Sequence, residues 1–353
     1  MDYNLFQQHT VNIYQLRNHD YEIRRVKARS LLKPQRFDLF AKLFYIKNVA
    51  IRKEEALKVY CEHIKAFNPD EREPGRYDKN GIQDFVSVFD DIINLFRDTD
   101  FDDKISIVPV DKNGVILDGA HRIAALAYYD KTVTIAQYYD VVAKCDFDYE
   151  YFKGRGLAWS VCDTIAHEMI MWCDNLLVAC LWPRMGNKMV KDKAIEQISS
   201  AHRIAYTKKL NVDLKSLINF VKEIYHSQSW TNNPDAILDK AIRIYGSGDN
   251  SVRFVFFENV EPLENLIDEK ERWRAGFGCE KDSLHVTDYS KETLQIADLV
   301  LNKDGLKDWL NDNQMNQFSN LVEERILYFK KVTWVGLKSR IWSLLHLKIC
   351  KKS

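Results

Sequence analysis

The sequence predicts an α+β protein, and three features indicate this class. Apolar residues recur at helical spacing through much of residues 37–98 and 149–245. Short β-rich runs bounded by turn residues occur between residues 105 and 138, and again from residue 252. Hydrophobic residues make up 46% of the 353 residues, so the chain can bury a substantial core. This length also suits two domains.

Charge and cysteine content limit the function classes. The 51 Lys and Arg residues balance 51 Asp and Glu residues, so no field over the whole protein draws it to nucleic acid, which is an unlikely partner. The seven cysteines contain no C-x-x-C pair, which argues against a disulfide framework or a zinc ribbon. Neither a signal-peptide pattern nor an apolar run of about 18 residues is present. We therefore expect a cytoplasmic protein.

Residues 1–148 are predicted to form the N-terminal domain, and its first elements are helical. The apolar spacing between Phe37 and Phe67 predicts two packed amphipathic helices. Residues 68–81 are rich in Pro, Gly and charge, which predicts a surface loop. Residues 82–98 are predicted to form a further helix.

The second half of this domain is predicted to run strand, turn, strand, helix, strand. Residues 105–110 and 115–117 are two apolar runs joined by Asn113-Gly114, a dipeptide that favours the positive φ angles of a hairpin turn. A helix beginning near His121 and a strand over residues 132–138 complete the order.

The remainder is predicted to contain a helical region (149–245), a C-terminal α/β unit (246–324) and a basic tail (325–353). The helical region has predicted breaks at residues 183–186 and 230–234. The expected elements of the α/β unit, in order, are a strand at Val252–Phe257, a helix at Leu263–Ala275, a strand at Ser283–Thr287 and a helix at Lys291–Val300.

The run Asp118-Gly119-Ala120-His121-Arg122 is the strongest candidate for a ligand site. It places a glycine between the end of a predicted strand and the start of a predicted helix. Exposed N–H groups at a helix N-terminus attract anions. His121 and Arg122 would lie in the first turn, where Arg122 offers a bidentate fork to phosphate oxygens. A structural interpretation remains open, in which Gly119 permits the turn, Asp118 caps the helix and Arg122 pairs with a surface acid.

This run, with Ile107–Val110 before it and Ile123-Ala124-Ala125 after it, resembles the central motif of the ParB/sulfiredoxin superfamily over about 40 residues. The resemblance implies a nucleotide-binding fold whose members bind CTP and DNA, repair an over-oxidised cysteine with ATP, or phosphorylate a small hydroxyl compound. Ala120 stands where sulfiredoxins carry their reactive cysteine, so that chemistry is excluded. Partition proteins usually show Glu-Arg-Arg at this turn, followed by a basic DNA-binding domain. This chain has Ala-His-Arg and no net charge, which argues against a partition protein.

The Asp-Gly-x-His-Arg form resembles most closely the small-molecule kinase branch of this superfamily. The resemblance implies ATP or a related nucleotide bound by Gly119, Ala120, His121 and Arg122, with Mg²⁺ as the second cofactor. It also implies a catalytic carboxylate near the γ-phosphate, for which Asp118 is the local candidate.

A second candidate site lies in Ser283-Leu284-His285-Val286-Thr287-Asp288, followed by Glu292. Ser283, His285 and Thr287 would share one strand face because side chains alternate. His285 and Asp288 are candidate catalytic residues, with His285 as general base, while Asp288 and Glu292 are candidate metal ligands. The alternative is that Asp288 or Ser290 caps the next helix and His285 is an interior residue.

Taken together, Arg36-Phe37-Asp38-Leu39 and the two candidate sites resemble a group of bacterial proteins found in surface-polysaccharide gene clusters. We therefore expect a nucleotide-dependent phosphotransferase that acts on a sugar or a similar hydroxyl substrate. Two alternatives stay open: a nucleotide-gated nucleic-acid-binding protein and a non-catalytic nucleotide-sensing partner of a glycosyltransferase complex.

The segment 325–353 contains eight Lys or Arg residues and no acid, with Trp334 and Trp342 among aliphatic residues. This composition predicts a basic amphipathic helix at an anionic inner-membrane surface. Docking on the body of the protein and contact with an RNA backbone are the alternatives.

Overall fold

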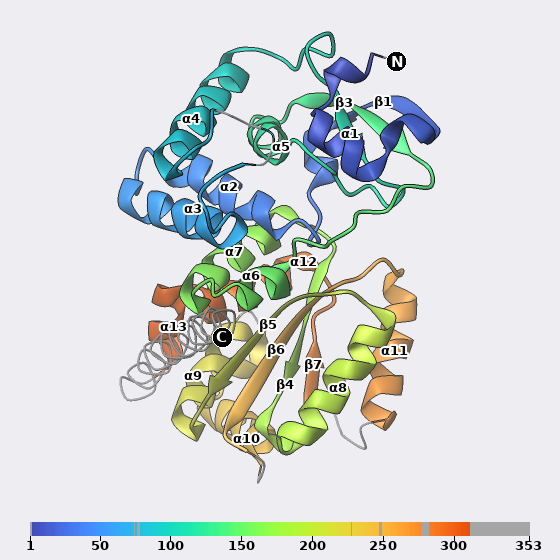
Figure 1. Ribbon diagram of the computed structural model, residues 1–353. Helices are drawn as coiled ribbons and strands as arrows, with labels where there is room; N and C mark the ends of the chain where they lie inside the picture. Colours follow the sequence, from blue (N-terminus) through green and yellow to red (C-terminus); the bar gives the residue numbers. More distant parts are fainter. Residues whose placement is uncertain are drawn as a thin grey trace, which may run out of the picture. The chain divides into compact units, whose positions relative to one another are not determined.

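A three-stranded sheet organises the N-terminal part of the chain (Figure 1). The computed structural model describes residues 2–310, except 74, 76, 77, 227, 247, 248 and 277–281. The strands are β1 (Tyr21–Lys27), β2 (Val108–Val110) and β3 (Thr132–Tyr138). Their order is β1-β3-β2, with β3 antiparallel to β1 and parallel to β2. The short α1 (Gln8–Tyr14) and its flanking residues pack on one face of this sheet through Val11 and Leu16.

Four helices complete this part: α2 (Phe37–Asn48), α3 (Lys53–Phe67), α4 (Ile82–Asp98) and α5 (Ala120–Tyr128). Helix α2 is central, because every residue from Phe37 to Ile46 is buried. Helix α4 buries Phe85, Phe89, Ile93 and Phe96, a spacing of four, four and three residues that forms one apolar stripe. These bounds confirm the helices predicted over residues 37–67 and 82–98.

The hairpin that leads to α5 is confirmed in its turn, although its second strand is reduced to one bridge between Val110 and Ile116. Gly114 has a φ of 81°, as the Asn-Gly turn requires. Asp111 holds the turn, because its Oδ1 accepts hydrogen bonds from the backbone N–H groups of Asn113 (2.8 Å) and Val115 (2.9 Å). The chain therefore reaches Asp118 in a fixed direction.

A second sheet of four strands follows, built from β4 (Leu176–Leu181), β5 (Ile204–Asn211), β6 (Ser251–Glu258) and β7 (Leu284–Val286). Its order is β5-β6-β4-β7, and all neighbours are antiparallel. Helix α8 (Lys188–Ala201) joins β4 to β5, and α11 (Leu263–Gly276) joins β6 to β7. This is the β-α-β-β-α-β order of a ferredoxin-like sheet. Helices α9 (Leu214–Ile224) and α10 (Pro234–Tyr245) are inserted between its second and third strands.

The two faces of this sheet are covered by different helices (Figure 1). Leu177, Ala179 and Leu181 of β4 pack with α8 and α11 in one apolar cluster. On the opposite face lie α9 and, further along the chain, α12 (Ser290–Leu301) and α13 (Lys303–Trp309). Phe220 of α9 shows this, with its ring centroid 5.7 Å from that of Phe254 in β6. Because side chains alternate along β7, His285 belongs to this second face.

Residues 149–245 are mostly helical, as predicted, but they also contain two strands that the sequence analysis did not predict. Helices α6 (Tyr149–Gly154) and α7 (Trp159–Trp172) open this region as expected, but β4 and β5 are strands. All six residues of β4 are buried, so its sequence is a continuous apolar run without the alternation that marks a strand. The predicted boundary at residue 245 therefore falls between strands of one sheet. Within the described residues, none of the helices is both long and apolar enough to cross a membrane.

Candidate functional site

The turn before α5 has the geometry of an anion site. Gly119 is the N-cap residue, with φ 85° and ψ 24°, and no side chain caps this end of the helix. Arg122 lies over Gly119, because a Cβ added there would come within 2.9 Å of Arg122 Nη2. Arg122 Nη2 also donates to Asp118 Oδ2 at 3.2 Å. Both side chains are about one-fifth exposed, so solvent reaches the pair.

A buried cluster behind this turn joins two cations to one carboxylate. Arg36 donates from Nε (2.8 Å) and Nη2 (2.9 Å) to the two oxygens of Asp38, and Lys42 Nζ lies 3.1 Å from Asp38 Oδ2. Arg36 Nη1 also donates to the carbonyl of Ile116 at 2.6 Å, two residues before Asp118. Arg36 therefore fixes the segment that leads into the turn.

The pKa values in this cluster follow from its burial and charges. Burial works against the charged forms of all three side chains, but Arg36 and Lys42 outweigh it at Asp38 and hold its pKa well below the usual value. At Lys42 burial prevails, with Arg36 acting in the same direction, and the pKa is lowered. Two basic groups thus share the carboxylate of Asp38, and the charge of Asp118 also acts on Arg36.

His121 is placed in an aromatic cluster. Its Nε2 lies 2.9 Å from the hydroxyl of Tyr60, and its ring meets that of Phe89 edge-on at 4.8 Å between centroids. Tyr60 donates to the carbonyl of Phe85 at 3.2 Å, so Nε2 of His121 is best assigned as the donor to Tyr60. The contacts of His121 therefore tie α5 to α3 and α4, which leaves Arg122 and the backbone N–H groups as the candidate donors to an anion at the turn.

His63 is a buried histidine that the sequence pattern does not single out. It is 0% exposed, and neither ring nitrogen makes a normal hydrogen bond with a described residue. Its ring packs against Phe152 at 5.0 Å between centroids. Burial, with Lys42 next in effect, lowers its pKa well below the usual value. His63 is thus a neutral ring beside the cationic cluster.

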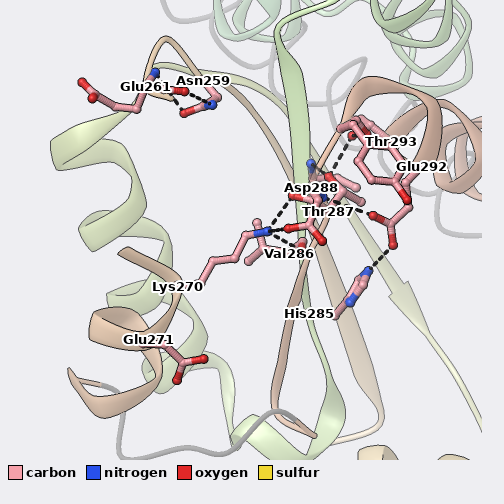
Figure 2. A network of polar contacts seen from close by, with 12 residues as sticks. Asn259, Glu261, Lys270, Glu271, His285, Val286, Thr287, Asp288, Glu292 and Thr293 are labelled. Atoms are coloured by element: carbon pink, nitrogen blue, oxygen red, sulfur yellow. Dashed lines mark hydrogen bonds and ion pairs between the residues drawn. The ribbon is translucent and has the colours of Figure 1, made fainter. Parts of the chain in front are cut away.

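The second candidate site is centred on His285, on the edge strand β7 (Figure 2). Its Nε2 lies 3.1 Å from Glu292 Oε1, an ion-pair distance without the alignment of a hydrogen bond. Glu292 comes from the first turn of α12, and its Oε2 accepts the backbone N–H of Asp288 at 3.2 Å. The ring of Tyr225 meets His285 edge-on at 6.0 Å. A carboxylate thus holds the imidazole from the helix behind the strand.

The Glu292 carboxylate is disposed to stay ionised. Burial raises its pKa, but contact with His285 and the hydrogen bond from the Asp288 N–H outweigh this effect, so the pKa lies below its usual value. An imidazole beside an ionised carboxylate can accept a proton from a hydroxyl group, because the positive charge that forms is stabilised.

The structure separates the two predicted metal ligands. Asp288 Oδ1 lies 2.5 Å from Lys270 Nζ, whereas the Glu292 carboxylate reaches His285, so the two groups have different partners (Figure 2). Over the described residues, no three His, Cys, Asp or Glu side chains gather where they could hold a metal ion. The backbone N–H of Asp288 therefore binds the Glu292 carboxylate, but the two carboxylates have different partners and do not face one metal position.

Lys270 gives the second site its shape. The ammonium group of this 5% exposed residue donates to the carbonyls of Val286 (3.0 Å) and Thr287 (2.9 Å) as well as to Asp288. An ammonium has three donors, and these three contacts use them all. Lys270 therefore fixes the end of β7.

The two candidate sites belong to different sheets. Gly119–Arg122 lies among α3, α4 and the Arg36 cluster, and His285 lies against α12 and Tyr225. The contacts found among the described residues join neither site directly to the other.

Comparisons with known proteins add little. No family model and no curated protein matches the chain. A nucleoside diphosphate kinase from Aquifex aeolicus aligns with 40% of this chain and 99% of its own, at 12% identity and a TM-score of 0.26. A nucleoside-diphosphate kinase from Borrelia burgdorferi, solved with vanadate and ADP, aligns with 39% of this chain and 88% of its own, at 12% identity and a TM-score of 0.24. Similarity this weak assigns neither activity nor ligand.

Proposed function

We propose that this chain is a nucleotide-dependent phosphotransferase, a kinase that moves a phosphoryl group from ATP or a related nucleotide to a small hydroxyl substrate such as a sugar. The setting that fits the sequence resemblance is bacterial surface-polysaccharide biosynthesis. In this proposal residues 1–148 form the ParB/sulfiredoxin-like nucleotide module and His285 handles the acceptor hydroxyl, so direct transfer requires the two sites to meet when both ligands are bound.

One observation carries the nucleotide half of the proposal: cationic side chains gather beside an uncapped helix N-terminus. The first N–H groups of α5 have no partner within the helix, and the positive end of its dipole favours an anion. Arg122 lies over this turn and can exchange Asp118 for a phosphate oxygen. Arg36 and Lys42 add positive charge behind the turn.

The chemical half rests on His285 and Glu292. The carboxylate contact supports a general-base role, in which His285 removes the proton of the attacking hydroxyl. We expect Mg²⁺ to arrive with the nucleotide, because Mg²⁺ at such sites is held mainly by phosphate oxygens, water and one or two carboxylates. Asp118, beside the turn, is the candidate carboxylate ligand for this Mg²⁺.

The direct test is turnover. Purified protein is incubated with ATP, Mg²⁺ and a panel of sugars and sugar phosphates, and ADP and phosphorylated products are measured. We expect equal amounts of ADP and one product, and loss of both in His285→Ala. An acid-labile phosphate on the protein, absent from that variant, would add a covalent step at the imidazole. ATP that stays intact with every acceptor would reject the phosphotransferase.

A second function, nucleotide sensing without catalysis within a glycosyltransferase complex, is favoured by one observation. The Asp288 carboxylate is occupied by the buried Lys270 and takes part in fixing the end of β7. A protein of this kind would bind the nucleotide with ordinary affinity and release it unchanged. Nucleotide binding that persists in the absence of any turnover would therefore support this second function.

We also propose peripheral contact with the inner membrane through residues 325–353, which lie outside the described residues. The proposal rests on composition, since each basic side chain near an anionic surface contributes roughly 1 kcal/mol. The full chain and a truncation after Glu324 are sedimented with anionic and neutral vesicles. We expect only the full chain to follow the anionic vesicles. Equal recovery of both proteins with them would remove the membrane role.

A further inference from the structure

Strand β1 ends the three-stranded sheet on one side, and its outer edge is open. Among the described strands it pairs with β3 alone. The four successive residues from Glu22 to Arg25 are all exposed, so both faces of the strand meet water as well. The edge strand β5 of the second sheet differs, because most of its residues are buried or partly buried. An open strand edge of this kind offers N–H and C=O groups to another strand.

The hydrogen bonds at the two ends of β1 show which backbone groups point outward. The N–H of Tyr139 donates to the carbonyl of Asp20 at 3.4 Å, and the N–H of Ala28 donates to the carbonyl of Lys131 at 3.0 Å. Hydrogen-bonded pairs alternate along an antiparallel ladder, and the register between these two pairs is unbroken, so the even-numbered residues of β1 bond to β3. The backbone groups of the odd-numbered residues therefore point away from β3, among them those of Tyr21, Ile23 and Arg25.

A second copy of the chain fits this edge with Ile23 at the centre. Two antiparallel copies of β1 related by a two-fold axis place the same surface against itself. With the axis at Ile23, this 46% exposed apolar side chain meets its own copy, and Glu22 lies opposite Arg24 on both sides of the axis. Tyr21 lies opposite Arg25, where a guanidinium can stack on the phenol ring. The outward backbone groups of Ile23 face those of the second Ile23, and those of Tyr21 face those of Arg25.

Charge disfavours the neighbouring registers. An axis at Glu22, at Arg24 or at Arg25 would place that charged residue directly opposite its own copy, and like charges facing each other destabilise a strand pair. The axis at Ile23 avoids this and forms two pairs of opposite charge. The strand is thus self-complementary in one register.

We propose that the chain self-associates through β1, with two copies of the strand paired antiparallel about Ile23 and two three-stranded sheets joined into one. Outward backbone groups, an exposed apolar side chain and complementary charges coincide in this one register. Because a single pair of short strands buries little surface, the dimer forms at high protein concentration. The proposal does not depend on the phosphotransferase function.

Charge reversal tests this pairing, because Glu22 and Arg24 are both exposed. The full chain, Glu22→Arg and Arg24→Glu are compared by sedimentation velocity over a concentration series. Each single variant places like charges opposite each other, so we expect its association constant to fall by about tenfold or more. An equimolar mixture of the two variants restores both pairs of opposite charge, and we expect it to form the dimer that neither variant forms alone.

A control variant and a cross-link complete the test. Asp98→Arg reverses one charge of the exposed Arg97–Asp98 pair of α4 and should leave the association unchanged. Ile23→Cys should form a disulfide-linked dimer on mild oxidation, because the two copies of this position face each other. Arg25→Cys, whose counterpart is Tyr21, should cross-link no more than the wild type does.

Four results would overturn the proposal. The full chain stays monomeric at every concentration of the series, or it dimerises and the single variants associate as well as the wild type. In the other two, the mixture of single variants fails to associate, or Arg25→Cys cross-links as efficiently as Ile23→Cys.

Discussion

His285 is a partly exposed histidine that pairs with a carboxylate and lies on a strand of the second sheet. The imidazole is about one-fifth exposed and faces Glu292, and the end of its strand is fixed by Lys270. His167 provides a matched comparison, because it is 19% exposed and its Nε2 lies 2.6 Å from Asp298 Oδ1. Both histidines pair with an acid of α12, but only His285 lies on a strand of the second sheet.

We expect His285→Ala to lower turnover by about a hundredfold or more and to leave nucleotide affinity within about twofold, since general-base catalysis typically contributes 10²–10⁴-fold. His167→Ala should leave both quantities near the wild-type values. Steady-state kinetics and a nucleotide titration on each variant measure the two effects. If His285→Ala changes only the melting temperature, the histidine is a packing residue and the chemistry lies elsewhere.

His63 links the cationic cluster to a pH dependence of stability. Its pKa is well below the usual value in the folded chain, whereas in the unfolded chain it takes up a proton below about pH 6.5. Unfolding therefore binds a proton in this range, and the free energy of unfolding falls as the pH drops. The contribution of His63 to the free energy of unfolding is fully present above about pH 6.5. Below that pH it is lost by up to about 1.4 kcal/mol per pH unit.

We expect His63→Phe to remove this part of the pH dependence, because a phenyl ring fits among aromatic neighbours and has no nitrogen to protonate. Urea unfolding of both proteins at several pH values from about 7.5 to about 5 spans the ordinary histidine pKa. It measures the difference in the free energy of unfolding between them. The free energy of unfolding of the variant, relative to that of the wild type, should rise steadily as the pH falls. A constant difference across the range would show that His63 takes up its proton equally readily in the folded and the unfolded chain, and would contradict a lowered pKa.

At the scale of elements, the packing of α13 on α12 depends on Gly305. A Cβ added there would lie 2.0 Å from the backbone oxygen of Asp298, so the two helices must separate if a side chain is introduced. The same contact buries Trp309, whose Nε1 donates to the carbonyl of Leu299 at 2.9 Å. Gly154, near the end of α6, has no atom within 4 Å of an added Cβ.

We expect Gly305→Ala to destabilise the protein by about 1–3 kcal/mol or more, the usual cost of overpacking. Gly154→Ala should be neutral or stabilising by up to about 1 kcal/mol, since alanine is the better helix former. Thermal unfolding of the two variants separates these outcomes. Equal melting temperatures would show that α13 does not pack as described.

How far the sequence predicts an element depends on whether its signal is local. Helix α4 is predicted to its observed ends because Phe85, Phe89, Ile93 and Phe96 form a stripe that only a helix produces. Strand β5 is missed because its pattern includes Lys208, a charged residue buried by its ion pair with Asp163 of α7. The acid lies 45 residues away in the sequence, so the pattern carries no trace of it.

The candidate sites follow the same rule at the scale of the whole molecule. The turn at Gly119 is predictable because its glycine, hairpin and helix adjoin in the sequence, and the structure places Arg122 over it. Lys42 and His63 beside it, and the contacts that Lys270 makes at the second site, become recognisable only once helices distant in the sequence are packed together. The paired acids at 288 and 292 suggest a metal site because spacing does not reveal the competing Lys270.

The central claim is that the turn before α5 binds a nucleotide, and a calorimetric titration of the intact protein with ATP, CTP and GTP tests it most directly. Arg122→Ala removes one charge-assisted contact worth about 1.5–3 kcal/mol, so affinity should fall by roughly ten- to a hundredfold. Arg97→Ala, which removes an exposed arginine of α4, should bind as the wild type does. Unchanged affinity for all three nucleotides in Arg122→Ala, or no binding by the wild type, would contradict the account.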